Sequence, residues 1–242
     1  MCRLIVAHGR FSSAQVFDAA LGMSCGRTAD HDGPIQRHPN GWGAVWRDGG
    51  RTLCHRDPRA IEAAAAEPTP IRELTTQFLA IHVRHATLAR NQGLACTHPL
   101  HYAAAGAPWY VLHNGFLPTV HQRLGRSSSE FDSAEYLEYL VHDAGPRLDL
   151  DATRDKLRAI PPGGSSANAI LVGPECAYLI HWTPEDTPYP RYFTMHRLDA
   201  GDCTIIASEV LPAFAPRERW QAMPPRTIHP LGFPAELGLP TT

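Results

Sequence analysis

The chain has 242 residues, a formal net charge of -2 and an isoelectric point near 6.7. One large α/β or β-rich domain of this length is common, so we expect one core. The nearly balanced charge offers no basic surface for nucleic acid, and no stretch reaches the roughly 18 apolar residues that a membrane span requires. We therefore expect a small-molecule partner, with neither nucleic acid nor a membrane involved.

The six cysteines are scattered over the chain and form no C-x-x-C pair. Such spacing is typical of free thiols in a reducing compartment. The apolar run after Arg3 is too short for a signal peptide, so a cytoplasmic protein is expected. The cluster Cys96-x-His98-x-x-His101 lacks a second ligand pair at zinc spacing, and no phosphate-cradling glycine loop precedes a lysine. We expect neither a metal nor a cofactor.

The first residues, MCRLIVAH, place a thiol where removal of Met1 would create a new amino terminus. A free α-amino group has a pKa of about 7.7–8.0, so near neutral pH it can accept a proton, whereas a lysine with a pKa of about 10.4 cannot. Cys2 could therefore carry both nucleophile and base. The run 4–7 predicts a buried strand that would hold it. Alternatively, Cys2 is only a small residue at a frayed end, and this stretch alone leaves both readings open.

The next elements follow from capping, turn and periodicity signals. Ser12 and Ser13 predict the start of a helix that ends near Gly22, and Asn40-Gly41 predicts a turn before a hairpin. The hairpin strands are expected over 42–46 and 51–56, with helices over 59–66 and 70–77 and a buried strand over 78–84.

Arg84 ends that last strand, where an unpaired guanidinium would cost several kcal/mol to bury. It is either paired with a protein carboxylate, which these residues alone favour, or it faces an anionic ligand.

The segment 91–108 is expected to be a loop, followed by a strand over 109–113 that stops at Asn114-Gly115. An asparagine amide and a glycine N–H can together form a two-donor oxyanion hole. The alternative is an ordinary hairpin turn, which is the commoner meaning of this dipeptide.

Asp132 is expected to begin an amphipathic helix and to form a capping box with Glu135. The carboxylate could also face a substrate ammonium. The apolar face of this helix is expected to contain Ala134, Leu137, Leu140 and Val141. A second helix over 152–159 and strands over 167–172, 176–182, 192–197 and 203–207 complete the pattern, the strands as an antiparallel meander. Helical patches between runs of strands are consistent with two sheets covered by helices.

Several motifs occur in a fixed order: MCRLIVAHG, HPNGWGAVW, HVRHAT, THPL, WYVLHNGFL, FDSAEYLEYL and, near the end, IIASEV. Taken together, they resemble class II glutamine amidotransferases, and among these the single-domain branch that includes the ergothioneine-pathway amidohydrolase. The resemblance implies an α+β fold, the N-terminal-nucleophile four-layer αββα sandwich. It also implies one domain over 2–210, with a proline-rich tail over 211–242 packed on it.

The resemblance implies hydrolysis of the side-chain amide of glutamine or another γ-glutamyl amide through a thioester on Cys2. Asn114 and Gly115 would form the oxyanion hole. Arg84 would bind the substrate α-carboxylate and Asp132 the α-ammonium. Thr87 and His98, from two of the motifs, are further substrate-binding candidates. The chain departs from the family pattern at Leu88, at the extra Ala134 and at Asn40.

The use of the released ammonia and the class of protein both stay open. The released ammonia could serve a separate synthetase, because no second core is expected after residue 210, or the enzyme could simply cleave a γ-glutamyl bond. A reading from another class is a catalytically inactive module that senses glutamine or docks to a partner.

Overall fold

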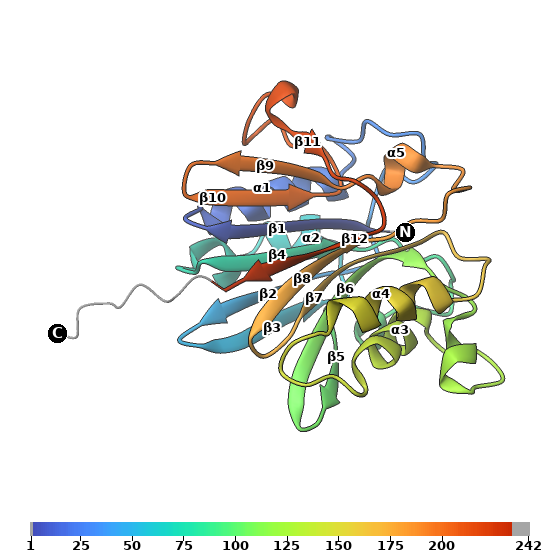
Figure 1. The fold of residues 1–242 in the computed structure, drawn as a ribbon. Coiled ribbons are helices and arrows are strands. Elements are labelled where there is room, and N and C mark those ends of the chain that lie inside the picture. The colour runs from blue at the N-terminus through green and yellow to red at the C-terminus, as the bar shows by residue number, and fades with distance from the viewer. Residues whose placement is uncertain (1, 234–242) are drawn as a thin grey trace.

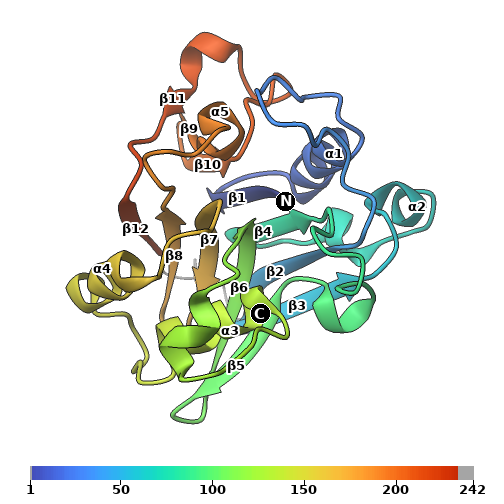
Figure 2. The same cartoon turned by 90° about the vertical axis from the view of Figure 1, so that its right-hand side faces the viewer.

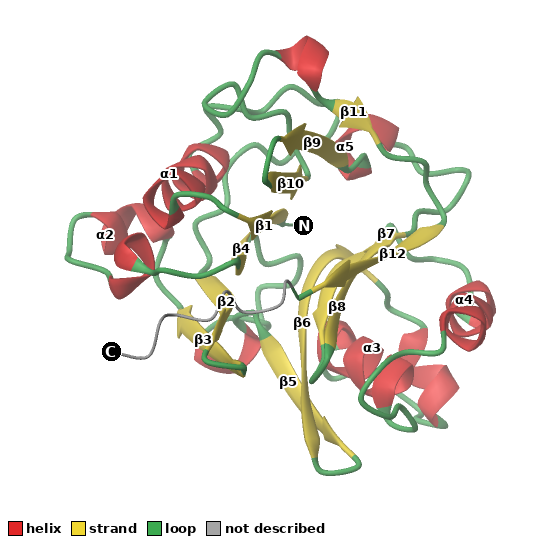
Figure 3. Cartoon of the chain, turned by 60° about the vertical axis from the view of Figure 1, so that its left-hand side comes forward, coloured by secondary structure: helices red, strands yellow, loops and turns green. Residues whose placement is uncertain are grey.

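The computed structural model describes residues 2–233. Its main strands form two antiparallel sheets that pack face to face, with helices on both outer sides (Figure 1). Figure 3 shows the resulting four layers, helix, sheet, sheet and helix. The αββα sandwich implied by the family resemblance is therefore confirmed.

The first sheet has seven strands, and the strand with the nucleophile candidate at its start lies in the middle. In spatial order they are β11 (Gln221–Ala222), β9 (His196–Ala200), β10 (Cys203–Ala207), β1 (Arg3–Gly9), β4 (Phe78–Val83), β2 (Trp42–Asp48) and β3 (Arg51–Asp57). The second sheet has five strands, in the order β12 (Thr227–Gly232), β8 (Cys176–His181), β7 (Ser166–Val172), β6 (Ala107–Phe116) and β5 (Leu100–Ala104).

Helices α1 (Ser13–Ser24) and α2 (Ile61–Ala65) cover the outer face of the seven-stranded sheet, and α3 (Asp132–Val141) and α4 (Leu150–Ala159) cover that of the other (Figure 3). The Ser12 hydroxyl caps α1 by accepting a hydrogen bond from the Gln15 N–H, as its sequence predicts. The short α5 (Pro190–Phe193) and the 3₁₀ turns η1 (Pro70–Glu73), η2 (Leu94–Cys96), η3 (Val120–Leu124) and η4 (Arg217–Arg219) lie in the connections.

Each central strand divides its side chains between two cores, because successive residues point to opposite faces. In β1, Leu4 and Val6 pack between the sheets, whereas Ile5 and Ala7 pack against α1. In β6, Leu112 lies between the sheets and Val111 faces α3. This alternation decides which polar residues beyond the strand ends enter the space between the sheets.

Several predicted elements require correction. The segment 91–108 contains β5, and β6 continues through Asn114 and Gly115 instead of stopping there. Asn114 pairs with Asn168 and Gly115 with Ala167 in β7, so the dipeptide is part of a strand and not a turn. The segment 70–77 contains only a 3₁₀ turn, and 192–193 lie in α5, so β9 begins later than predicted.

The prediction of one continuous meander over the last strands was wrong, because β8 and β9 belong to different sheets. Helix α3 begins at Asp132 as predicted, but the predicted capping box of Asp132 with Glu135 is wrong. Phe131 occupies the cap position and makes no side-chain cap bond, while the Glu135 carboxylate accepts the N–H of Glu130. Ala134 is exposed, in contrast to the rest of its predicted apolar face.

Residues 212–233 supply a short strand to each sheet, β11 beside β9 and β12 beside β8, which the sequence reading missed. Residues 234–242 of the predicted tail lie outside the described residues. The domain boundary at residue 210 stays a prediction.

The motif IIASEV holds the beginning of β1 in place. Ser208 makes two hydrogen bonds with the backbone of Leu4. The Ser208 hydroxyl accepts the Leu4 N–H at 3.0 Å, and the Ser208 N–H donates to the Leu4 carbonyl oxygen at 2.9 Å. The next residue, Glu209, pairs with Arg3 at 2.6 Å, and both side chains are almost completely buried. The Arg3 guanidinium also stacks 3.7 Å from the centre of the Tyr192 ring. Arg3 and Leu4, the two residues that follow Cys2, are therefore held in place.

We expect Glu209→Gln to lower the free energy of unfolding by about 3 kcal/mol, because it leaves the buried Arg3 charge uncompensated. Urea unfolding followed by circular dichroism measures this change. The matched control is Glu175→Gln, which removes the exposed pair of Glu175 with Arg147 and should cost less than about 1 kcal/mol. Equal losses in the two variants would contradict the anchoring role of Glu209.

Candidate active site

The site lies where β1 begins and β4 ends. These strands are antiparallel neighbours with Arg3 opposite Val83, so Cys2, directly before β1, and Arg84, directly after β4, lie side by side. Because successive side chains of a strand point to opposite faces, Cys2 and Arg84 lie on the face of the sheet that is turned toward the other sheet. Figure 2 looks onto this end of the sandwich, with β1 and β4 of one sheet beside β6 and β7 of the other.

Asn114 reaches Cys2 from the opposite sheet. The backbone N–H of Cys2 donates to Oδ1 of Asn114 at 2.9 Å, and both residues are buried. The amide nitrogen Nδ2 of Asn114 is also buried and has no hydrogen-bond partner among the described residues. Buried polar groups are nearly always paired, so this donor is an exception that a ligand oxygen would satisfy.

The Cys2 thiol is buried and lies 3.8 Å from the carbonyl oxygen of His85. Burial alone raises the pKa of this thiol, but nearby positive charges, including those of His82 and Arg84, outweigh burial and lower the pKa to about 5. At neutral pH such a cysteine is a thiolate, the form that acts as a nucleophile.

Arg84 is 3 % exposed and has no carboxylate partner within residues 2–233. Its guanidinium donates to two backbone carbonyl oxygens, that of Asn91 at 2.6 Å and that of Asn40 at 3.4 Å. The internal ion pair that the strand pattern alone favoured is therefore wrong. Carbonyl oxygens do not neutralise a buried cation, so the charge can still attract an anion in the adjoining cavity.

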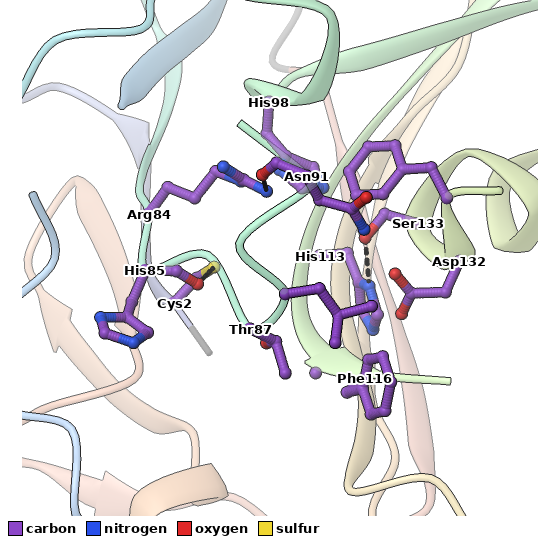
Figure 4. A pocket seen from close by; sticks show the side chains of 13 residues that line it. Cys2, Arg84, His85, Thr87, Asn91, His98, His113, Phe116, Asp132 and Ser133 are labelled. Carbon is purple, nitrogen blue, oxygen red and sulfur yellow. Dashed lines mark hydrogen bonds between the residues drawn. The ribbon is translucent and has the colours of Figure 1, made fainter. Parts of the chain in front are cut away.

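Cys2 and Arg84 line one cavity of about 330 Å³, including its open mouth, together with four other predicted site residues: Thr87, His98, Gly115 and Asp132 (Figure 4). Asn114, the seventh, contacts Cys2 directly. The fold thus brings all seven predicted positions together, from the two sheets, the start of α3 and the loops between them. Their chemical roles stay predictions.

Asp132 lies on the five-stranded side of the cavity (Figure 4), and Gly115 of β6 also lines it. Oδ2 of Asp132 accepts the N–H of Leu117 at 2.8 Å, which fixes the carboxylate at the cavity wall. A Cβ atom on Gly115 would lie closer than 3.0 Å to the Ser166 carbonyl oxygen and to Nε2 of His113. Glycine is therefore required where this strand passes the cavity.

His98 is buried and neither of its ring nitrogens has a hydrogen-bond partner among the described residues. Its ring lies 4.3 Å from that of His82. Burial, with the charge of His82 second, lowers the pKa of His98 well below its usual value, so the ring is neutral at pH 7. His98 can offer the cavity an uncharged polar wall.

Sequence reasoning missed two histidines at this site. His113 lines the cavity and is held by the Ser133 hydroxyl at 2.9 Å and the Ser166 carbonyl at 3.2 Å. His82 is fully buried beside Cys2. A usable signal existed for His82, because it lies two residues before Arg84 in a strand and so shares its face.

Within residues 2–233, no three His, Cys, Asp or Glu side chains are grouped so that they could hold a metal ion. In the same part of the chain, no helix has the length and apolar character needed to cross a membrane.

Comparison with solved structures supports the fold. The structure of an allosteric regulatory enzyme of purine biosynthesis matches with a TM-score of 0.67 and 16% identity, over 96% of this chain and 47% of its own. A glutamine phosphoribosylpyrophosphate amidotransferase from B. subtilis gives 0.58 and 16%, over 92% and 49%. A glutamine aminotransferase class-II domain protein from Silicibacter pomeroyi gives 0.57 and 13%, over 96% and 95%. The chain therefore spans about half the length of the first two proteins and nearly all of the third.

A sequence comparison with curated proteins gives no match. The family model for class II glutamine amidotransferases, however, matches residues 1–158, well over half of the chain. This stretch contains Cys2, Arg84, Asn114, Gly115 and Asp132. The chain belongs to the class II glutamine amidotransferases.

Proposed function

We propose that this protein hydrolyses the side-chain amide of glutamine or of another γ-glutamyl amide through a thioester on Cys2. The observation that carries the proposal is the contact between the backbone nitrogen of Cys2 and Oδ1 of Asn114, which leaves the buried Nδ2 of the same amide without a partner. One side chain thus orients the nitrogen next to the nucleophile and offers a donor to the reacting carbonyl oxygen.

The first step requires removal of Met1, after which the nitrogen of Cys2 becomes a free α-amine that can still donate to Asn114. The lone pair of this amine accepts the thiol proton, directly or through a water molecule. The thiolate attacks the side-chain carbonyl of the substrate. Nδ2 of Asn114 and the N–H of Gly115 stabilise the oxyanion, whose collapse releases ammonia or an amine. Water then hydrolyses the thioester to glutamate.

Arg84 and Asp132 would hold the amino-acid end of the substrate. The buried guanidinium of Arg84 has no carboxylate partner in the described part of the chain, which supports binding of the substrate α-carboxylate. Asp132, on the opposite wall of the cavity, would accept the α-ammonium (Figure 4). Thr87 and His98 would complete this part of the pocket. Two charged anchors would place the amide carbon within reach of the Cys2 sulfur.

We further propose that residues 2–210 form the hydrolase domain and that the following residues as far as 233 pack on it, supported by the pairing of β11 and β12 with the two sheets. In one form of this proposal, a separate synthetase uses the released ammonia. The other form of this proposal is a stand-alone amidase that cleaves γ-glutamyl amides. Rates with glutamine and with substituted γ-glutamyl amides, measured without a partner, distinguish these two.

Removal of Met1 and reactivity of Cys2 can be tested together. We expect the intact mass of the purified protein to correspond to a chain that begins at Cys2, and a diazo-ketone analogue of glutamine to label that residue. Cys2→Ala should abolish both labelling and hydrolysis, because no other group replaces the nucleophile, while its circular dichroism spectrum stays unchanged. Retention of Met1 on the native protein would instead favour an inactive module that senses glutamine or docks to a partner.

The oxyanion role of Asn114 gives a second expectation. Asn114→Ala should lower kcat for glutamine by about 100-fold to 1,000-fold, because it removes one donor to the transition-state oxygen. Unchanged labelling of Cys2 by iodoacetamide in this variant would show that the nucleophile remains in place. A kcat equal to that of the wild type would contradict the assignment.

The role of Arg84 is tested with a substrate that lacks its partner. Arg84→Ala should lower kcat/KM for glutamine by at least about tenfold, since the α-carboxylate loses a charge-assisted hydrogen bond. With 4-aminobutanamide, which has no α-carboxylate, the wild type and the variant should differ little. Equal losses with both substrates would mean that Arg84 acts on the fold or on Cys2, and not on the carboxylate.

A further inference from the structure

His82 is a buried histidine with an unusual pattern of contacts. It is 0 % exposed, and its Nε2 lies 3.1 Å from the backbone carbonyl oxygen of His113 in the opposite sheet. A carbonyl oxygen can only accept, so Nε2 carries the hydrogen and donates it. Nδ1 then holds a lone pair, and this atom has no hydrogen-bond partner among the described residues. Within the protein interior, His82 therefore presents an unused proton acceptor.

The strand register places this acceptor near the nucleophile. His82 lies opposite Leu4 in the β1 and β4 pair, and Cys2 precedes Leu4 by two residues on the same face. Arg84 follows His82 by two residues, also on this face. His82 and Arg84 thus lie next to each other on the same face of the sheet, and Cys2 lies beside them at the start of the neighbouring strand. The effect of the His82 charge on the pKa of the Cys2 thiol agrees with this placement.

The other titratable groups around His82 do not compete for this role. His98 packs on its ring at 4.3 Å, and His113 provides the carbonyl oxygen that Nε2 contacts. Burial is the main cause that lowers the pKa of both His98 and His113, so neither carries a lasting charge at neutral pH. Arg84 is a fixed cation and cannot accept a proton. The Cys2 thiol is the group in the neighbouring strand that can give a proton to His82.

We propose that His82 accepts the thiol proton of Cys2 at Nδ1 and holds the sulfur as a thiolate in the resting enzyme. This inference rests on the thioester route of the proposed function and replaces its first proton transfer: the thiol proton goes to His82, and the α-amine is left to exchange protons with the leaving nitrogen and the attacking water. The S–H bond breaks and an N–H bond forms on His82. The α-amine, in its ammonium form, then gives a proton to the leaving nitrogen as the C–N bond breaks.

During hydrolysis of the thioester, the neutral α-amine takes a proton from the attacking water and becomes an ammonium again. Collapse of the second tetrahedral intermediate breaks the C–S bond and restores the thiolate beside the protonated His82. His82 thus keeps its proton through the cycle. It acts as a positioning and charge-stabilising residue for the nucleophile, and it need not touch the substrate.

The test is the pH dependence of Cys2 alkylation by iodoacetamide, read from the mass of the N-terminal peptide so that other cysteines do not interfere. The wild type should show half-maximal reactivity near pH 5. His82→Gln keeps an amide donor for the His113 carbonyl but removes the Nδ1 acceptor, so its midpoint should rise by at least about one pH unit. At pH 6, kcat/KM for glutamine should fall by at least about twofold in this variant, because a smaller fraction of Cys2 is ionised, and it should approach the wild-type value above the new midpoint.

The matched control is His181→Gln, which replaces another buried histidine, at the end of β8 and outside the cavity. Its alkylation midpoint should equal that of the wild type. A folded His82→Gln variant with an unchanged midpoint overturns the proposal, and if this variant unfolds, His82→Asn is measured by the same criterion. Alkylation needs no substrate, so a wild-type protein that reacts near pH 5 but hydrolyses no γ-glutamyl amide refutes the proposed function and leaves the role of His82 supported.

Discussion

The arrangement of the site depends on one hydrogen bond between the two sheets, from the backbone nitrogen of Cys2 to Oδ1 of Asn114. Cys2 begins the central strand of one sheet and Asn114 lies near the end of a central strand of the other. The bond is buried, where a lost partner costs more than it does in water. It therefore fixes the distance between Cys2 and Nδ2 of Asn114, the groups that we propose as nucleophile and as donor to the reacting oxygen. The same bond uses the acceptor of the amide and leaves the donor available.

Core packing and site assembly use the same strand alternation. Leu4, Ala80 and Leu112 bury apolar surface between the sheets, and this burial sets the register of β1, β4 and β6. A shift of one residue in any of these strands would turn its apolar residues outward. It would also remove Cys2, Arg84 or Asn114 from the space between the sheets. Selection for a packed core thus also preserves the geometry of the site.

Much of this organisation is predictable from the sequence, but local signals fail where pairing with a distant strand determines the backbone conformation. The Ser12 cap, the hairpin after Gly41 and the strand that ends at Val83 follow from nearby residues. Asn114-Gly115 has the local preference of a turn, yet pairing with β7 extends the strand through it. The family resemblance placed these two residues at the site even though their predicted conformation was wrong.

The buried polar residues show a second limit of sequence reasoning. A buried arginine is expected to have a carboxylate partner, and Arg3 has one in Glu209, more than 200 positions away in the chain. Among the described residues Arg84 has none, and its guanidinium donates hydrogen bonds to two carbonyl oxygens. Both arginines adjoin apolar strand residues, so local sequence cannot distinguish them. The distinction depends on long-range contacts, which only the folded chain provides.

The difference between these two arginines has a physical meaning. The Arg3 and Glu209 pair neutralises itself and holds the beginning of β1, so its charges are unavailable to a ligand. Arg84 leaves a buried charge without a counter-ion, and Nδ2 of Asn114 and Nδ1 of His82 have no hydrogen-bond partner among the described residues; each of these lowers stability. All three lie around one cysteine. A substrate that brings a carboxylate and a developing oxyanion would satisfy the first two, and a thiolate at Cys2 would satisfy the third once His82 is protonated. At this site, bound substrate and ionised sulfur can therefore relieve the local destabilisation.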